Sequence, residues 1–265
     1  IMTREMLQEC ERDLQLDFAY QIDGVGRFRG NAYMQTRGKA LAFRAIPTKI
    51  RKLETLQLPD GVVEQFTKRS GLILVTGPTG SGKSTTLAAI VDYINHRQKG
   101  HIITVEDPVE FIHNCDKCLI HQRQIGTHAK SYAAALKAAL REDPDIILVG
   151  EMRDLETIEL ALTAAETGHL VLATLHTRNA SKTLDRIIAV FPSEQQNQIR
   201  NMAAESVRAV ISQVLLPRDD TEGMVAAYEI LISTPGIQNL IRENKIYQIP
   251  SAIQTGSRLG MRSME

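Results

Sequence analysis

The sequence contains no tryptophan and only three cysteines, and aromatic residues make up 5% of its 265 residues. Three cysteines cannot build a disulfide scaffold, which is typical of a chain that works in a reducing cytoplasm. No run of 18 apolar residues occurs, so the sequence contains no candidate transmembrane helix. The 31 basic residues balance the 31 acidic ones. This balance and the scarcity of stacking aromatics disfavour a motor that works on nucleic acid.

What is present is ordinary globular composition, with 43% hydrophobic and 23% charged residues. The length allows one large domain or two modest ones. The chain begins with Ile1 rather than methionine, which indicates a fragment of a longer protein.

The first fifty residues predict a small α+β unit. A helix is expected over residues 3–14, followed by strands over 17–22, 26–35 and 40–46 that glycines separate. Because three strands and one helix make a thin core, residues 1–50 are expected to be only part of a domain. Residues 51–70 are interpreted as a linker that includes a helix from Pro59 to Lys68.

From Gly71 the pattern changes to short apolar runs separated by helical segments. Strands are predicted over 71–76, 101–105, 145–149 and 169–175, and helices over 84–97, 131–142 and 155–167. Asp154 is expected to be the N-cap of the last of these helices. This alternation is typical of an α/β fold with a parallel sheet covered on both faces, which we place at residues 71–216. Residues 217–265 are expected to form a helical C-terminal region after one strand over 224–232. Thr234 and Pro235 mark a helix start there.

A phosphate-binding loop is the strongest motif. The stretch that matches the Walker A pattern is Gly77, Pro78, Thr79, Gly80, Ser81, Gly82, Lys83 and Ser84, followed by Thr85. Glycines let backbone N–H groups turn toward phosphate oxygens at a helix N-terminus. Lys83 supplies a positive charge to the β- and γ-phosphates, and the Ser84 hydroxyl is a ligand for Mg²⁺. A chance match of a glycine-rich turn is disfavoured because the motif lies between a strand and a helix.

Hydrolysis needs carboxylates near this loop, and two candidates follow buried strands. Glu151 follows the apolar run of residues 146–150. The acidic segment Glu106-Asp107-Pro108-Val109-Glu110 follows the strand predicted over residues 101–105. Carboxyl ends of parallel strands share one edge of the sheet with the phosphate loop. The alternative for any single acid is a helix cap or a surface charge. His169 and His176 lie on either side of another strand, where a histidine serves either as a hydrogen-bonding residue or in catalysis.

Together these motifs resemble the type II/IV secretion ATPase superfamily, and within it the branch of type IV pilus retraction ATPases. The resemblance rests on the phosphate loop, the acidic segment, Glu151 and the boxes around His169 and His176. Residues 140–145 and 253–256 match the retraction branch.

The resemblance implies a RecA-like ATPase core preceded by part of a PAS-like domain, assembled as a homohexamer that uses ATP and Mg²⁺. By position, Glu110 matches the general base and Glu151 the acid near Mg²⁺, while His169 and His176 match the histidine pair. Arg27, Arg29 and Arg44 match arginines that approach phosphates, at least one from a neighbouring subunit. The alternative is that these arginines line a solvated strand face.

The implied function is a motor for pilus retraction and twitching motility. It would dock at the cytoplasmic face of the bacterial inner membrane without inserting, and its partners would be a platform protein and a paralogous pilus ATPase. The alternatives are a pilus assembly or type II secretion ATPase, or a paralogue that only binds nucleotide in the ring. Gly236 and Gln238 depart from the retraction branch and put retraction itself in question. Cys115 and Cys118 are interpreted as free thiols rather than zinc ligands.

Overall fold

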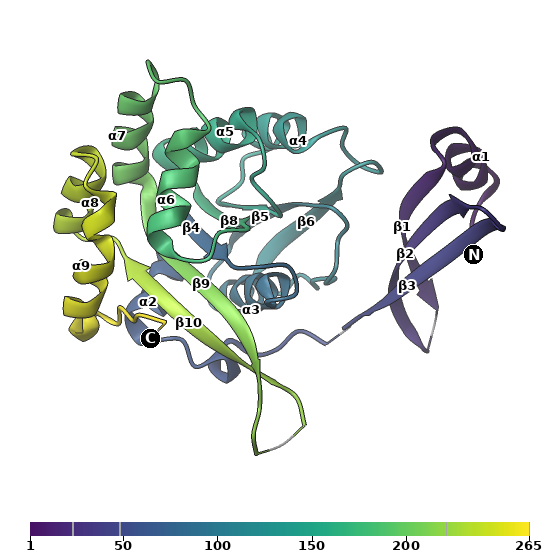
Figure 1. The fold of residues 1–265 in the computed structure, drawn as a ribbon, viewed down its shortest axis with the longest axis horizontal. Coiled ribbons are helices and arrows are strands. Elements are labelled where there is room, and N and C mark those ends of the chain that lie inside the picture. Colours follow the sequence, from purple (N-terminus) through teal and green to yellow (C-terminus); the bar gives the residue numbers. More distant parts are fainter. Residues whose placement is uncertain (23, 48, 221, 265) are drawn as a thin grey trace.

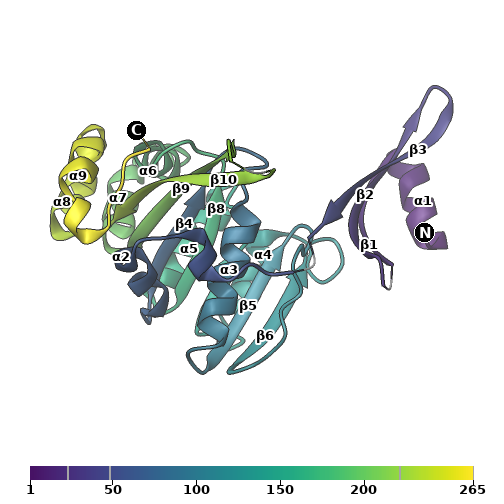
Figure 2. The ribbon, with the colours of Figure 1, turned by 90° about the horizontal axis from the view of Figure 1, so that it is seen from below.

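The computed structural model describes residues 1–22, 24–47, 49–220 and 222–264. Figures 1 and 2 show a small three-stranded sheet that stands apart from a larger α/β unit. Within the described ranges, no helix is both long enough and apolar enough to cross a membrane.

The small unit contains α1 (Arg4–Asp13) and an antiparallel sheet in the order β1 (Gln15–Ile22), β2 (Gly26–Gln35) and β3 (Gly38–Ile46). The side chain of Thr3 caps α1 by accepting a hydrogen bond from the N–H of Met6. The small hydrophobic core of this unit consists of Cys10, Phe18 and Ala32, with four partly buried side chains packed around them. The helix and three strands predicted for this segment are therefore confirmed.

The larger unit is built on a seven-stranded sheet in the order β10-β9-β4-β8-β7-β5-β6. Its strands are β4 (Gly71–Thr76), β5 (Gly100–Glu106), β6 (Cys118–Gln124), β7 (Ile146–Val149), β8 (Leu170–Leu175), β9 (Val207–Pro217) and β10 (Met224–Ile232). The strands from β4 to β9 pair in parallel, and β10 pairs antiparallel with β9 at one edge. All residues of β4, β7 and β8 are buried, as expected for strands that are covered on both faces.

Helices cover both faces of this sheet. They are α3 (Lys83–Asn95), α4 (Tyr132–Ala139), α5 (Leu155–Glu166), α6 (Ala180–Ala189), α7 (Gln196–Ser206), α8 (Pro235–Arg242) and α9 (Ile249–Thr255). In Figure 1, α4 and α5 lie above the sheet and α3 lies below it. Asp154 caps α5 and Thr234 caps α8, each accepting a hydrogen bond from an N–H three residues later. Both predicted helix starts are confirmed, and the expected α/β fold class is confirmed with them.

Two expected elements differ from the structure. The helix predicted from Pro59 to Lys68 is instead one short α-helical turn, α2 (Asp60–Val63), which continues as a 3-10 turn, η2 (Glu64–Thr67). The sheet that was expected to be parallel has one antiparallel edge strand, because β10 pairs antiparallel with β9. The strand predicted over 224–232 therefore extends the main sheet, while the division of the chain into domains stays a prediction.

Candidate active site

One edge of the large sheet collects the predicted site. The neighbouring strands β4, β8, β7 and β5 are parallel, so their carboxyl ends lie together. The segments that leave this edge are the phosphate loop after Thr76, His176 after Leu175, Glu151 after Gly150, and the acidic segment after Glu106. The parallel direction of these strands alone therefore places the other three segments at the same edge of the sheet as the phosphate loop.

The phosphate loop connects β4 to α3, which begins at Lys83. Gly77 and Gly82 have φ angles of 145° and 86°, which side chains rarely adopt. A Cβ on Gly77 would also collide with the carbonyl oxygen of Gln213. Backbone amides can therefore turn inward only because these positions are glycine.

Lys83 lies inside this loop. Its Nζ donates hydrogen bonds to the carbonyl oxygens of Gly77 (2.9 Å) and Pro78 (3.1 Å). Burial lowers the pKa of Lys83, while the negative charges of Glu151 and Glu110 oppose that shift. Both predicted acids therefore act electrostatically on the phosphate-loop lysine.

Glu151 is paired with two basic side chains. Its Oε2 lies 2.6 Å from Nη2 of Arg153, and its Oε1 lies 3.1 Å from Nε2 of His176. Burial would raise the pKa of Glu151, but the hydrogen bonds and charges of Arg153 and His176 outweigh it and lower the pKa. The side chain is only 16% exposed, so a carboxylate is held here by its partners.

His176 connects Glu151 to Lys83. Its Nδ1 lies 3.5 Å from Nζ of Lys83, which can only donate. Its Nε2 faces the Glu151 carboxylate, which can only accept. A neutral imidazole that carries its proton on Nε2 satisfies both contacts.

The acid at position 151 follows a glycine for a steric reason. A Cβ on Gly150 would meet the hydroxyl of Tyr132 and the carbonyl oxygen of Val105, each at 3.1 Å. The N–H of Gly150 donates to that same carbonyl (2.7 Å), and its own carbonyl accepts from the Thr174 hydroxyl (2.5 Å). The close approach of β5 to β7 therefore favours glycine at position 150.

The acidic segment begins with Glu106 at the end of β5. Its Oε1 accepts hydrogen bonds from the Thr104 hydroxyl (2.7 Å) and from Nε2 of Gln122 (3.3 Å), and its carboxylate also accepts from the N–H of Glu110. Burial raises the pKa of Glu106, and these hydrogen bonds oppose the shift. Glu106 is bonded to side chains of β5 and β6, whereas the charge of Glu110 reaches Lys83.

His169 does not join this group. It precedes β8, at the opposite end of the strand from His176. Seven residues of extended chain span about 23 Å, so the two histidines lie at opposite edges of the sheet. Nδ1 of His169 is 3.0 Å from the carbonyl oxygen of Ala164, near the end of α5. Its catalytic role stays a prediction that this single chain does not support.

The three predicted arginines share one face of the small sheet. Arg27 and Arg29 lie two residues apart in β2 and therefore on the same face of the sheet, and Arg29 lies directly opposite Arg44 of β3. Arg27 is half-buried; desolvation lowers its pKa, and the negative charge of Glu106 opposes the shift. Among the described residues, Nη1 of Arg27 is buried without a hydrogen-bond partner. The arginine face is therefore directed, at Arg27, toward the acidic segment of the same chain.

Sequence reasoning missed two polar residues that support the site. Arg153 is the first; it lies two residues after Glu151, and its side chain pairs with the Glu151 carboxylate. The second is Gln213 of β9, which is 1% exposed. Its Nε2 donates to the carbonyl oxygen of Ser81, and its Oε1 accepts from the Thr86 hydroxyl (2.8 Å). Gln213 thereby ties the phosphate loop to the first turn of α3.

Cys115 lies in the connection between β5 and β6, and Cys118 begins β6. All three cysteines are free thiols, and the described residues contain no group of three or more His, Cys, Asp or Glu side chains placed to hold a metal ion. Burial raises the pKa of the Cys118 thiol, which donates a hydrogen bond to the carbonyl oxygen of Gln98.

A glycine-rich loop with its lysine at the carboxyl edge of a parallel sheet, flanked by acids on neighbouring strands, defines a P-loop nucleotide-hydrolysing domain. The family model described as type II/IV secretion system protein matches residues 27–258, and the chain belongs to this family.

The most specific similarities lie within one branch of that family. The chain is 54% identical, over 269 residues, to the type IV pilus retraction ATPase PilT of Pseudomonas aeruginosa, covering 100% of this chain and 77% of that protein. It is 55% identical over 265 residues to a twitching motility protein of Neisseria gonorrhoeae, covering 100% and 71%. A crystal structure of the pilus retraction motor PilT with bound ADP superposes with a TM-score of 0.91 at 47% identity, covering 99% and 79%.

Proposed function

We propose that this chain is an ATP-hydrolysing motor subunit that powers type IV pilus retraction, the disassembly step of twitching motility. The observation that carries the proposal is the convergence of Lys83, Glu110 and Glu151 at one sheet edge. Two relatives that share more than half of the aligned residues with this chain are a pilus retraction ATPase and a twitching motility protein. Gly236 and Gln238, the two departures from that branch, lie on α8, whose apolar side chains Ile237 and Ile241 are buried regardless.

The phosphate-loop residues fit a nucleotide. Backbone amides of residues 77–84 and Nζ of Lys83 would hold the β- and γ-phosphates. The hydroxyl of Ser81 is buried and, among the described side chains, lacks a hydrogen-bond partner, as expected for a group that awaits a ligand. Thr85 follows in the first turn of α3, where its backbone N–H can also face the phosphates.

The acids divide the chemistry between them. Ser84 and Glu151, the latter through water, would hold Mg²⁺, which neutralises charge on the phosphates when bound. Glu110 would orient the attacking water and accept its proton as the general base. Arg153 and His176 both bind Glu151 in the present arrangement, so nucleotide binding has to compete with one ion pair and one hydrogen bond for that carboxylate.

The arginine face supports assembly into a homohexamer. Arg29 and Arg44 lie opposite each other across two strands, and two like charges in that position repel each other unless an anion lies between them. Phosphates bound to a neighbouring subunit would supply that anion. An arginine delivered in this way is worth about 10³–10⁵ in rate where such residues are known. We expect the ring to work in the cytoplasm, docked on a membrane platform protein and assisted by a paralogous pilus ATPase.

The proposal is tested with the purified protein and with the cell that makes it. ATP hydrolysis, a mass that corresponds to six subunits, and loss of twitching on gene deletion are expected together. Deletion of an assembly ATPase would instead leave the cell without surface pili, and deletion of a secretion ATPase would leave twitching unchanged. A subunit that only binds nucleotide would hydrolyse no ATP.

Trans action of the arginines is tested by mixing variants. Arg29→Ala and Glu110→Gln should each be nearly inactive alone. Rings that contain both variants contain some interfaces with an intact Arg29 facing an intact Glu110, so mixing should restore part of the activity. Repeating the experiment with Arg27→Ala and Arg44→Ala identifies the arginine that acts. Absence of recovery in rings shown to be mixed counts against action across the interface.

A further inference from the structure

The segment that carries Glu110 connects β5 to β6 and has no secondary structure of its own over residues 107–117. Its position therefore depends on side chains that bind its backbone. Three amide side chains of neighbouring elements do so: Asn95 at the end of α3, and Gln122 and Gln124 of β6.

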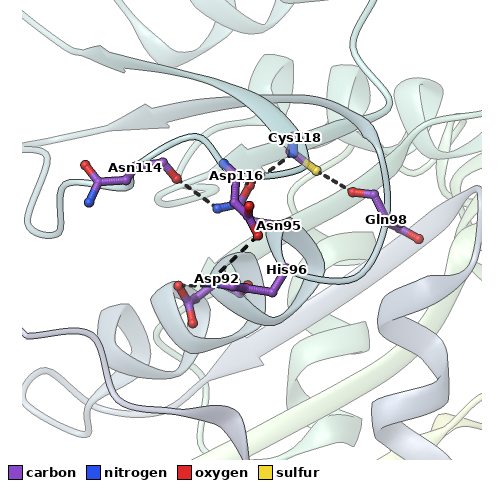
Figure 3. A network of polar contacts seen from close by, with 7 residues as sticks. All are labelled: Asp92, Asn95, His96, Gln98, Asn114, Asp116 and Cys118. Carbon is purple, nitrogen blue, oxygen red and sulfur yellow. Dashed lines mark hydrogen bonds and ion pairs between the residues drawn. The ribbon is translucent and has the colours of Figure 1, made fainter.

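Asn95 holds the far end of the segment (Figure 3). Its Nδ2 donates to the carbonyl oxygen of Asn114 (2.8 Å), and its Oδ1 accepts from the N–H groups of Asp116 and Cys118 (3.1 Å each). Because Asn95 is only 2% exposed, water cannot replace these bonds. The end of the segment next to β6 is thus fixed to the same helix that begins at the phosphate loop.

Gln122 and Gln124 hold the near end, around Glu110. Nε2 of Gln122 donates to the carbonyl oxygen of Phe111 (2.8 Å), and its Oε1 accepts from the N–H of His113 (2.9 Å). Oε1 of Gln124 accepts from the N–H of Val109 (3.2 Å). The two residues on either side of Glu110 are therefore each bound to a β6 glutamine.

Gln122 also reaches Glu110 by a second route. Its Nε2 lies 3.3 Å from Oε1 of Glu106, and the Glu106 carboxylate accepts a hydrogen bond from the N–H of Glu110. In the parallel register of β5 and β6, Gln122 lies opposite Thr104, whose hydroxyl binds the same Oε1 of Glu106. Glu110 is thereby held through its own N–H and through the carbonyl of the next residue.

We infer that Gln122 is a positioning residue for ATP hydrolysis, which fixes the backbone that follows Glu110 and, through Glu106, the N–H of Glu110 itself. It thereby sets the distance between the Glu110 carboxylate and the attacking water. This inference rests on the proposed role of Glu110 as general base. Gln122 itself touches neither the phosphate loop nor Lys83 in any hydrogen bond of the structure's described part. Its effect should therefore fall on the rate of the chemical step rather than on nucleotide binding.

The test is Gln122→Met, which keeps length and volume while removing the donor and the acceptor. Because misplacing a reacting group by about 1 Å can cost on the order of 10²-fold, kcat should fall by about 10- to 100-fold, with KM for ATP changed by less than about threefold. The matched control is Gln196→Met, since Gln196 is another partly buried glutamine that binds a carbonyl, that of Phe191 (3.0 Å), away from the site. The control should lose some thermal stability and keep its kcat.

A double-mutant cycle separates positioning from general destabilisation. In a Glu110→Gln background there is no base left to position, so adding Gln122→Met should lower single-turnover hydrolysis by less than about twofold more. Equal fold-losses in both backgrounds, or a kcat for Gln122→Met within about twofold of the parent, would overturn the inference. If Gln122→Met does not fold, Gln122→Asn takes its place, because it keeps a neutral amide but is one methylene too short to make the same bonds to Phe111 and His113.

The cycle also separates this inference from the function on which it rests. A parent protein that hydrolyses no ATP contradicts the proposed function. Full turnover in Glu110→Gln alone contradicts the base assignment, and the inference fails with it. A slow Glu110→Gln beside an unimpaired Gln122→Met contradicts the inference alone.

Discussion

Replacing Gln213 with leucine should destabilise the phosphate loop, because it removes hydrogen bonds that hold the loop, while it changes none of the predicted site residues. The amide lies in β9 and connects the Ser81 carbonyl to the Thr86 hydroxyl. All three residues are at most 2% exposed, so no water can take over the lost bonds. Leucine has nearly the same volume, which limits the effect of a cavity.

The size of the effect follows from those contacts. Two neutral hydrogen bonds contribute about 1 kcal/mol each, and a buried polar group left without a partner costs about 1–3 kcal/mol. Because the Thr86 hydroxyl can turn toward another acceptor, we expect Gln213→Leu to lower the free energy of unfolding by about 2–4 kcal/mol. ATP affinity should fall as well, since the loop that holds the phosphates loses its tie to α3.

Urea denaturation and nucleotide titration of four proteins provide the assay: the parent, Gln213→Leu, Thr86→Val and the double variant. Removing both partners of a buried bond costs less than removing one, so the double variant should be more stable than additivity predicts by about 1 kcal/mol. Ser212→Ala is the control. Ser212 lies beside Gln213 in β9, and its substitution removes one buried hydroxyl contact, that with Thr76 of β4 (2.8 Å), but no hydrogen bond to the phosphate loop. Additive losses, or unchanged ATP affinity in Gln213→Leu, would show that the amide does not support the loop.

Four further predictions concern charged and titratable groups. Lys83→Ala should abolish ATP hydrolysis with little loss of stability, and parent-like turnover would contradict the phosphate-loop assignment. Glu110→Gln should bind Mg²⁺ and ATP but turn over about 10²–10⁴-fold more slowly, whereas Glu151→Gln should regain part of its rate as Mg²⁺ is raised. Burial lowers the pKa of His113 from 6.5 to about 4, so the unfolded chain takes up the proton first as the pH falls. Neutral His113 therefore makes its full contribution to the free energy of unfolding above pH 6.5. The contribution decreases as the pH falls toward 4, by about 2 kcal/mol at pH 5. Denaturation of His113→Leu at pH 7 and pH 5 should lack that decrease.

Motifs with local geometry were predictable from the sequence. A glycine-rich loop between an apolar run and a helix can form at only one edge of a parallel sheet, so the neighbourhood of Lys83 and Glu151 followed from strand order. Helix starts at Asp154 and Thr234 were predictable for a similar reason, since a cap contacts a backbone group three residues away.

Other elements depend on packing that no local signal records. Helix α7 ends at Ser206 and β9 begins at Val207 without a glycine or proline between them, so the sequence offers no boundary there. The segment after Pro59 has helical composition, yet the structure confines it to a short turn and a 3-10 turn, where Phe66 and Val62 are fully buried. Burial of these two side chains takes precedence over helix propensity.

The supporting amides belong to a third class, which the sequence hides for a chemical reason. Gln122 and Gln213 act on carbonyl and N–H groups, which every residue carries, so neither partner leaves a residue type that a motif could match. What the sequence does contain is their setting: Gln122 alternates with Cys118 and Ile120 along β6, and Gln213 follows the apolar run of β9, so each side chain is directed into the protein. A glutamine there must find partners for its donors and its acceptor, because an unpaired buried amide is costly. In an α/β ATPase the unpaired backbone groups that such an amide can bind lie in the loops at the sheet edge, and those loops carry the catalytic residues. An inward-directed glutamine near the carboxyl end of a strand is therefore a physical reason to look for a positioning residue.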